Sequence, residues 1–286
     1  MTNIGSLHLQ IELKDKQQKV QLVQITDSHL GSQPNEPLVG MDTDVSLAHV
    51  VKLVAKERSS IDLLLATGDI SNSGSVSSYQ RFRHVTRPLA RHALWLPGNH
   101  DTADAMLQGI EGGEELSRSA VMGNWQILML DSTTEGEVGG CFTQKELDLL
   151  KQSLNASAKN IQNNPVKHVL ICLHHHPVNI GCAWLDEQKV ANADDFFAIL
   201  DQFEHVRGVL WGHIHQSIDR ERHGVRLMAT PSSCVQFAPN SPHFKLDQLN
   251  PGYRWLELHA DGCINSGVSR VTGVHFDLDY EDSTGY

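Results

Sequence analysis

The amino-acid sequence predicts an α/β fold in which a layered β-sheet packs against a second sheet. Short apolar runs bounded by Gly, Asp and Asn recur along the chain. Amphipathic helical patterns lie between several of these runs, and strands that alternate with helices are typical of layered α/β sheets. The last apolar runs follow one another through turns without helices, which indicates the second sheet.

Six early runs are each predicted to be a strand, because apolar and β-branched residues lie between turn-forming residues. They are residues 19–26, 61–66, 93–96, 125–130, 167–173 and 206–211. Three helices are predicted between strands. The first has apolar side chains at the i, i+3, i+4 and i+7 positions of residues 47–54. Thr143 and Glu146 form a capping-box pattern before the second, and residues 193–203 are the third.

One domain is predicted over residues 1–286, a length near the upper limit for one hydrophobic core. Its core motifs occupy residues 20–216, residues 217–275 supply the second-sheet strands and close the fold, and residues 276–286 form a polar tail. The first residues lack the basic and apolar regions of a secretory signal, and no apolar stretch reaches the length of a membrane span. The expected location is therefore the cytoplasm, with no membrane partner.

The composition restricts the class of substrate. With 23 Lys+Arg against 34 Asp+Glu, the net charge of −11 opposes the binding of a nucleic-acid polymer through many phosphate contacts. An anionic substrate is therefore expected to be small and drawn by a local positive centre. The five cysteines are scattered without a C-x-x-C pair, which favours buried thiols over a disulfide framework or a zinc ribbon.

Metal-competent side chains follow five of the predicted strands, and this placement is the strongest functional pattern in the sequence. In open α/β sheets, ligands bind at the carboxyl ends of the strands. Residues i and i+2 of an extended segment project to the same side, so a D-x-H and an H-x-H pair each present two ligands together. The candidates in chain order are Asp27, His29, Asp69, Asn99, the run His174–His176, His213 and His215.

These residue types predict a catalytic centre with two divalent metal ions. Mixed carboxylate, amide and imidazole ligands suit a catalytic site better than a structural zinc site. Gly68, Gly98 and Gly212 each precede a candidate ligand, where the chain must turn sharply and approach closely. A water shared by two such metals loses its proton near neutral pH and becomes the nucleophile of phosphoester hydrolysis.

The ordered motifs D-x-H, GD, GNHD, HHHP and GHIH resemble those of the calcineurin-like metallophosphoesterases over roughly residues 20–216. The segments WLPGNHD, HHHPVNIGCAWLD and ATPSSCVQF are similar, more specifically, to those of the bacterial class III 3′,5′-cyclic-AMP phosphodiesterases. This resemblance implies a four-layer αββα sandwich of two mixed β-sheets flanked by helices. It also implies hydrolysis of cyclic AMP to 5′-AMP, with a metal-bridging hydroxide as the nucleophile.

The same resemblance implies a role for each candidate ligand. It assigns the first metal to Asp27, His29 and His215, and the second metal to Asn99, His174 and His213. Asp69 bridges the two metals. His175 is the alternative to His174, and His176 is expected to be structural. The resemblance favours iron or manganese, and the ligand types also suit cobalt or zinc.

His100 is adjacent to a ligand and, by resemblance, donates a hydrogen bond or a proton to the phosphate or to the leaving oxygen. Asp101 is expected to orient His100 or to keep it protonated; the alternative is a solvent-facing loop carboxylate. The residues expected to contact the substrate are His29, Asp69, Asn99, His100, His174 and His215.

The metal motifs do not distinguish a cyclic AMP phosphodiesterase from a phosphodiesterase or phosphatase for another small phosphoester, such as cyclic GMP, a glycerophosphodiester, a nucleotide or another phosphomonoester. A nuclease and a non-catalytic scaffold are further alternatives; the acidic charge argues against the first and the complete ligand set against the second. Trp184 and Phe237 are either base-stacking residues or core residues. The resemblance is compatible with a homodimer.

Overall fold

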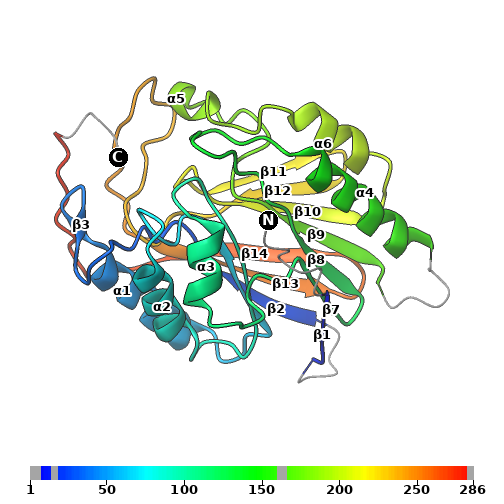
Figure 1. Ribbon diagram of the computed structural model, residues 1–286, viewed down its shortest axis with the longest axis horizontal. Helices are drawn as coiled ribbons and strands as arrows, with labels where there is room; N and C mark the ends of the chain where they lie inside the picture. The colour runs from blue at the N-terminus through cyan, green and yellow to red at the C-terminus, as the bar shows by residue number, and fades with distance from the viewer. Residues whose placement is uncertain (1–7, 14–18, 160–165, 282–286) are drawn as a thin grey trace.

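The computed structural model describes residues 8–13, 19–159 and 166–281. Two large β-sheets lie face to face between two groups of helices (Figure 1). This arrangement confirms the expected sandwich of two mixed sheets. Among the described residues, no helix combines the length and the apolar character that crossing a membrane requires.

The larger sheet has seven strands in the order β1-β7-β8-β9-β10-β12-β11. In that order they are His8–Ile11, Ser119–Met122, Trp125–Met129, His168–Cys172, Val206–Trp211, Val225–Ala229 and Ile218–Arg222. The strands from β8 to β12 run parallel to one another, whereas β7 and β11 pair antiparallel with their inner neighbours. The carboxyl ends of β9 and β10 therefore lie at the same edge.

The smaller sheet has five strands in the order β14-β13-β2-β5-β6. In that order they are Ile264–Arg270, Gly252–His259, Lys19–Gln24, Leu63–Thr67 and Ala93–Leu96. The strands β2, β5 and β6 are parallel, and β13 and β14 continue the sheet antiparallel. A short hairpin of β3 (Pro37–Leu38) and β4 (Met41–Asp42) precedes the first helix.

The helices are divided between the two outer faces (Figure 1). On the side of the five-stranded sheet lie α1 (Thr43–Glu57), α2 (Val76–Thr86) and α3 (Ala103–Gly109). On the side of the seven-stranded sheet lie α4 (Gln144–Lys159), α6 (Ala193–Leu200) and the short α5 (Ala183–Asp186).

Side chains along each strand point alternately to the two faces of its sheet, which allows one face to pack on the other sheet and the opposite face on helices. Leu63 and Leu65 of β5 pack in the apolar layer between the sheets, whereas Leu64 packs with the helix-facing core. Successive side chains of a strand point to opposite faces, so a strand that is apolar at every position is buried on both. All five residues of β5 are buried.

The expectation that residues 217–275 supply the strands of the second sheet is wrong for β11 and β12. Strands β11 and β12 extend the sheet of β10, whereas β13 pairs with β2 and carries β14. The six early strands are also divided, three to each sheet. Hydrophobic pattern shows which side chains of a strand are buried but not which strand lies beside it, so the sequence could not assign strands to sheets.

Two smaller expectations are also corrected. Helix α4 has only half of the predicted capping box: the Glu146 N–H donates to Thr143 Oγ1 at 3.3 Å, but the Glu146 carboxylate pairs with Arg118 instead. The predicted tail does not begin at residue 276, because Phe276 is buried and its ring contacts that of His49 on α1. The last part of that tail, residues 282–286, lies outside the described residues.

Candidate metal centre

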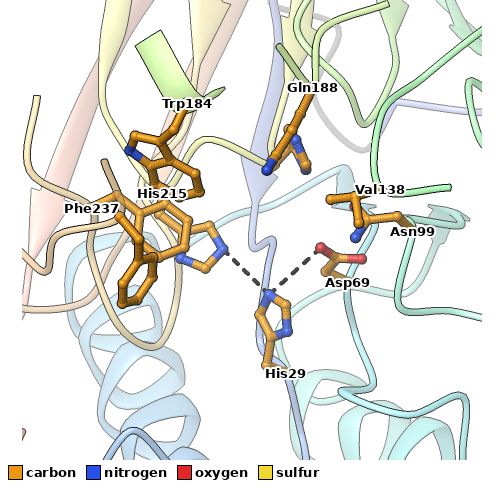
Figure 2. A pocket seen from close by; sticks show the side chains of 10 residues that line it. His29, Asp69, Asn99, Val138, Trp184, Gln188, His215 and Phe237 are labelled. Atoms are coloured by element: carbon orange, nitrogen blue, oxygen red, sulfur yellow. Dashed lines mark hydrogen bonds and ion pairs between the residues drawn. The ribbon is translucent and has the colours of Figure 1, made fainter. Parts of the chain in front are cut away.

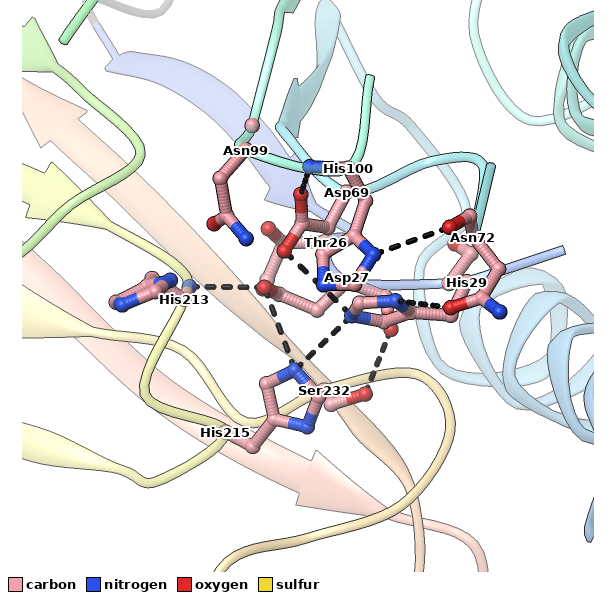
Figure 3. A network of polar contacts seen from close by, with 12 residues as sticks. Thr26, Asp27, His29, Asp69, Asn72, Asn99, His100, His213, His215 and Ser232 are labelled. Carbon is pink, nitrogen blue, oxygen red and sulfur yellow. Dashed lines mark hydrogen bonds and ion pairs between the residues drawn. The ribbon is translucent and has the colours of Figure 1, made fainter. Parts of the chain in front are cut away.

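The predicted ligands gather at one edge where the two sheets meet (Figure 3). They follow the strands β2 (Asp27, His29), β5 (Asp69), β6 (Asn99), β9 (His174) and β10 (His213, His215). The first three of these strands belong to the five-stranded sheet and the last two to the seven-stranded sheet. The centre is therefore assembled from the carboxyl ends of parallel strands in both sheets.

Five of the seven predicted ligands have a left-handed backbone, which residues other than glycine rarely adopt. They are Asp27 (φ 53°), His29 (44°), Asp69 (49°), His213 (65°) and His215 (49°). Each such residue costs on the order of 1 kcal/mol or more, and such residues cluster at functional sites. Backbone hydrogen bonds hold two of them: Asp27 N–H donates to Gly68 O at 3.0 Å, and His29 N–H to Asp69 O at 2.9 Å.

The glycines before the ligands allow the close approach that the sequence predicted. A Cβ atom at Gly98 would lie 2.2 Å from Asp69 Oδ1, and one at Gly212 would lie 2.5 Å from Asp27 Oδ2. A Cβ atom at Gly68 would lie 2.3 Å from His174 Nδ1. Each glycine thus gives space to a ligand that comes from a different strand.

Asp27, His29 and His215 form the first group of ligand atoms, which lie within 4.8 Å of one another. The Nε2 atoms of His29 and His215 are 3.3 Å apart, and Asp27 Oδ1 is 3.5 Å from His215 Nε2. Asp27 Oδ1 also accepts the backbone N–H of His213 at 2.8 Å. Asp27 Oδ2 is buried and accepts no hydrogen bond from the described residues.

Asp69, Asn99 and His174 form a second group beside the first. His174 Nε2 lies 3.2 Å from Asp69 Oδ2 and 3.2 Å from Asn99 Oδ1. Asp69 Oδ2 is also 3.6 Å from His29 Nε2, so this carboxylate lies between the two groups. The ring of His213 is 5.0 Å from that of His174, and its Nε2 is buried without a hydrogen-bond partner among the described residues.

Three of the imidazoles are held through Nδ1, which leaves Nε2 directed into the centre. His174 Nδ1 donates to Thr67 O at 2.8 Å, and His215 Nδ1 donates to Val235 O at 2.8 Å. His29 Nδ1 is 3.3 Å from the amide oxygen of Asn72. Oxygen partners of this kind fix the tautomer and the ring orientation of metal-binding histidines.

The electrostatics of the centre fit bound cations. Burial lowers the pKa of His29 and of His213 well below the usual value, which favours the neutral imidazoles that bind metals. Burial opposes ionisation of Asp69, yet the adjacent His174 and His29 hold the pKa of Asp69 well below its usual range. Asp27 Oδ2 and His213 Nε2 are both buried and have no hydrogen-bond partner among the described residues, so each has a lone pair that a cation could accept.

The structure separates the three histidines of the triple run. His174 Nε2 faces Asp69 and Asn99, as described above. His175 uses both ring nitrogens elsewhere, since Nε2 donates to Val138 O at 3.0 Å and Nδ1 is 2.8 Å from Ser132 Oγ. His176 is fully buried with its ring stacked on His213 at 5.8 Å, and burial lowers its pKa to about 4. This geometry favours His174 as the ligand over His175.

His100 lies at the edge of the centre, with its ring 4.8 Å from that of His29. Its backbone N–H donates to Asp69 Oδ1 at 2.9 Å, and its Nδ1 donates to Asn72 O at 3.0 Å. The Asn72 carbonyl, rather than Asp101, therefore orients the imidazole.

Asp101 is not a solvent-facing loop carboxylate. Its carboxylate accepts hydrogen bonds from Ile70 N, Ser71 N, Gly98 N and the Tyr79 hydroxyl. Burial and the nearby Asp69 raise the pKa of Asp101 to about 6. Asp101 thus holds together the loops that carry Asp69 and Asn99, and its carboxylate is directed to these donors instead of to the His100 ring or to solvent.

A cavity of about 200 Å³ opens over the centre (Figure 2). Its floor is formed by His29, Asp69, Asn99, His213 and His215. Its outer walls are formed by Val138, Trp184, Gln188, Phe237 and Phe244. The arrangement can hold two adjacent cations and present them to a small phosphorylated molecule.

Sequence reasoning missed Asn72, Val138, Gln188 and Phe244. Asn72 supports His29 and His100, and Gln188 and Phe244 line the cavity. None of them lies in a ligand motif, and Phe244 is brought to the cavity by a loop in which Phe237 pairs with Leu246. A serine- and glycine-rich stretch around Asn72 was the one available signal, and it is typical of any turn.

Comparison with known proteins finds a family profile that matches most of the chain and relatives that match nearly all of it. The family profile described as calcineurin-like phosphoesterase matches residues 20–217. A protein of Pseudomonas aeruginosa named 3′,5′-cyclic adenosine monophosphate phosphodiesterase CpdA is 46% identical over 93% of this chain and 95% of that protein. The protein of the same name from Escherichia coli (strain K12) is 39% identical over 94% of this chain and 95% of its own length.

A solved structure shows the same fold at low sequence identity. The dimetal phosphatase from Danio rerio superposes with a TM-score of 0.56 at 14% identity, covering 88% of this chain and 99% of that one. At this identity the likeness concerns the fold alone.

Proposed function

Because the chain belongs to the calcineurin-like phosphoesterases, we propose that it is a metal-dependent phosphodiesterase that hydrolyses 3′,5′-cyclic AMP to 5′-AMP. The observation that carries this proposal is the convergence of seven ligand-type side chains from five strand ends, and five of these side chains line one small cavity. The relatives that cover nearly the whole chain carry the name of this activity.

Two divalent cations are held in this proposal by the two groups of side chains. Asp27, His29 and His215 would hold the first, Asn99, His174 and His213 would hold the second, and Asp69 would be shared between them. The unpartnered Asp27 Oδ2 and His213 Nε2, together with the facing Nε2 atoms of His29 and His215, support this assignment. When bound, such ions polarise the phosphoryl oxygens and activate water for in-line displacement.

The chain's own residues bind and orient the substrate. Two divalent ions against the carboxylates of Asp27 and Asp69 leave a charge of about +2, which attracts a phosphodiester monoanion in an otherwise acidic protein. His29, Asp69, Asn99, His174 and His215 surround the place of the phosphate. His100, oriented by the Asn72 carbonyl, donates a hydrogen bond or a proton to the ribose 3′-oxygen as that oxygen leaves.

The identity of the metals and the cellular setting belong to the same proposal. Imidazole and carboxylate ligands without thiolates suit iron or manganese, and also cobalt or zinc. The cytoplasmic location and the homodimer stay predictions of the sequence.

A substrate panel tests the proposal. Purified protein is reconstituted separately with Fe(II), Mn(II) and Zn(II) and assayed on cyclic AMP, cyclic GMP, an aryl phosphodiester and an aryl phosphomonoester. We expect kcat/KM for cyclic AMP to exceed that for either aryl substrate by about tenfold or more, because binding energy from a nucleoside is available only to the two cyclic nucleotides. Cyclic AMP turnover no faster than that of the aryl diester would reject the substrate and keep the enzyme class.

A further inference from the structure

Three aromatic side chains form one wall of the cavity above the metal centre. Trp184 and Phe237 are 5.1 Å apart between ring centroids, Phe237 and Phe244 are 5.5 Å apart, and Trp184 and Phe244 are 5.5 Å apart. All three pairs are edge-to-face, so the rings support one another as a rigid cluster. We call these three residues the aromatic wall.

The aromatic wall is attached to the metal centre through one ligand. The Phe237 ring lies parallel to that of His215, with centroids 4.1 Å apart and planes 3° apart. Phe237 is only 5% exposed, whereas Trp184 and Phe244 are partly exposed to the cavity. Phe237 therefore packs the ligand, and the other two rings present the surface that a bound molecule can reach.

The two segments that carry the wall are fixed by hydrogen bonds of their own. The Asp186 carboxylate accepts the backbone N–H of Ile180 at 2.7 Å and of Gly181 at 3.1 Å, which ties the segment before α5 to the helix that carries Trp184. The loop that carries Phe237 and Phe244 is closed by Ala238 N–H donating to Lys245 O at 2.8 Å. A rigid wall loses little entropy when it binds a ligand.

Gln188 reaches into the same cavity across from Trp184 (Figure 2). Its side-chain amide makes no hydrogen bond to the described residues, and the side chain is only partly buried. An amide presents one acceptor and two donors at a fixed spacing. This group is therefore available to a ligand that lies against the aromatic wall.

We propose that the aromatic wall and Gln188 form a subsite for the purine base of the nucleotide. The base stacks on Trp184 and Phe244, and the Gln188 amide forms hydrogen bonds with the edge of the base. This inference rests on the proposed function, because the phosphate on the metal centre places the base at the outer cavity. Stacking on aromatic rings does not discriminate between bases, because every base has a flat π-face. A glutamine amide matches the adenine N6 donor and N7 acceptor together, whereas guanine presents acceptors at both positions.

The experiment compares cyclic AMP with the base-free cyclic ribose phosphate, which is the same diester with hydrogen in place of the base. We expect the wild type to prefer cyclic AMP by about tenfold or more in kcat/KM. Phe244→Ala and Trp184→Ala should each lower kcat/KM for cyclic AMP about five- to 50-fold, mainly through KM, and leave the base-free substrate unchanged. Phe244→Trp keeps an aromatic ring at this position, so its kcat/KM for cyclic AMP should equal that of the wild type.

Gln188 has a separate readout. Gln188→Met keeps the length of the side chain and removes its hydrogen bonds, so the ratio of cyclic AMP to cyclic GMP turnover should fall about five- to tenfold. Phe203→Ala is the matched control, because Phe203 is a partly buried aromatic residue after α6 whose ring contacts His205, outside the cavity. That variant should leave all three cyclic substrates unaffected.

Three results would overturn the base subsite. Equal wild-type turnover of cyclic AMP and the base-free substrate would show that the base is not bound. Parallel loss on both substrates in the wall variants would show that the wall only supports His215. Hydrolysis of an aryl diester with no hydrolysis of either cyclic phosphate would reject the proposed function itself, and the subsite with it.

Discussion

At the scale of single residues, the histidines of the centre are distinguished by what holds their Nδ1 atoms. Backbone carbonyls or an amide oxygen hold His29, His174 and His215 through Nδ1, whereas both ring nitrogens of His175 contact Ser132 and Val138. These histidines thus differ in role because their hydrogen-bond partners differ. Asn72 is central to this pattern, because its amide contacts His29 and its backbone carbonyl contacts His100.

His100→Ala separates proton donation from metal binding. The variant keeps the backbone N–H that donates to Asp69 Oδ1, so the bridging carboxylate should stay in place. We expect unchanged metal content and a loss of kcat of about 100- to 10,000-fold on cyclic AMP. Elemental analysis and steady-state kinetics measure both quantities, with the exposed His84→Ala as control. Near-normal kcat would remove His100 from the mechanism.

Asn72→Ala tests the support of His29. The substitution removes the amide oxygen but keeps the backbone carbonyl that orients His100. Loss of such a partner should weaken metal affinity about 10- to 100-fold, as measured by competition with a chromogenic chelator. Asn72→Asp restores an oxygen acceptor and should bind metal at least as tightly as the wild type. Equal affinity in all three proteins would contradict this role.

At the scale of elements, the centre depends on how closely the loop after one strand approaches the next strand. Gly212, after β10, packs against the end of β2, where a Cβ atom would lie 2.4 Å from Thr26 Oγ1 and 2.5 Å from Asp27 Oδ2. Asp101 performs the complementary task, because its carboxylate joins the loops after β5 and β6. The positions of the ligands therefore depend on contacts between the loops that follow different strands.

Gly212→Ala should push the loop after β10 away from the end of β2, which carries Asp27. We expect at least a tenfold loss of kcat/KM and reduced metal content, because displacements of about 1 Å at a reacting centre can cost 100-fold in rate. Gly139→Ala is the matched control at the rim of the same cavity, where a Cβ atom would meet Gln188 at an ordinary 3.4 Å. Similar losses in both variants would show that close approach at Gly212 is not the cause.

Short-range sequence patterns were enough to predict most of the candidate ligands but few of the residues that surround them. Strand ends, D-x-H spacing and the preceding glycines are short-range features, so the amino-acid sequence alone was enough to predict Asp27, Asp69 and His213 as ligands. The role of Asp101 could not be predicted in this way, since its partners lie up to 31 positions away. The same holds for Phe244, and for the pairing of β13 with β2, which joins opposite ends of the chain.

At the scale of the whole molecule, the two sheets must keep a fixed relation because each contributes ligands. Their shared apolar layer contains Leu63 and Leu65 from one sheet and Leu170 and Leu210 from the other. Arg254 of β13 adds a polar link, donating to Ile218 O at 3.0 Å and to Ala229 O at 2.8 Å in the opposite sheet. Burial lowers the pKa of Arg254 to about 10, which still leaves it charged at neutral pH.

Arg254→Met should therefore destabilise the protein. Two carbonyls would lose their donor inside the molecule, and we expect the free energy of unfolding to fall by about 2–4 kcal/mol. Denaturant titration measures the change. Arg222→Met removes a surface pair with Asp201 and should cost about 1 kcal/mol or less. An Arg254 variant as stable as the Arg222 variant would show that the sheets do not depend on this link.

The most direct test of the two-metal centre is anomalous X-ray diffraction from crystals grown with Mn(II), recorded on both sides of the manganese absorption edge. We predict two anomalous peaks per chain, one among Asp27, His29 and His215 and the other among Asn99, His174 and His213. Asp69 should contact both peaks. A single peak, or a second peak coordinated by His175 instead of His174, would contradict the account.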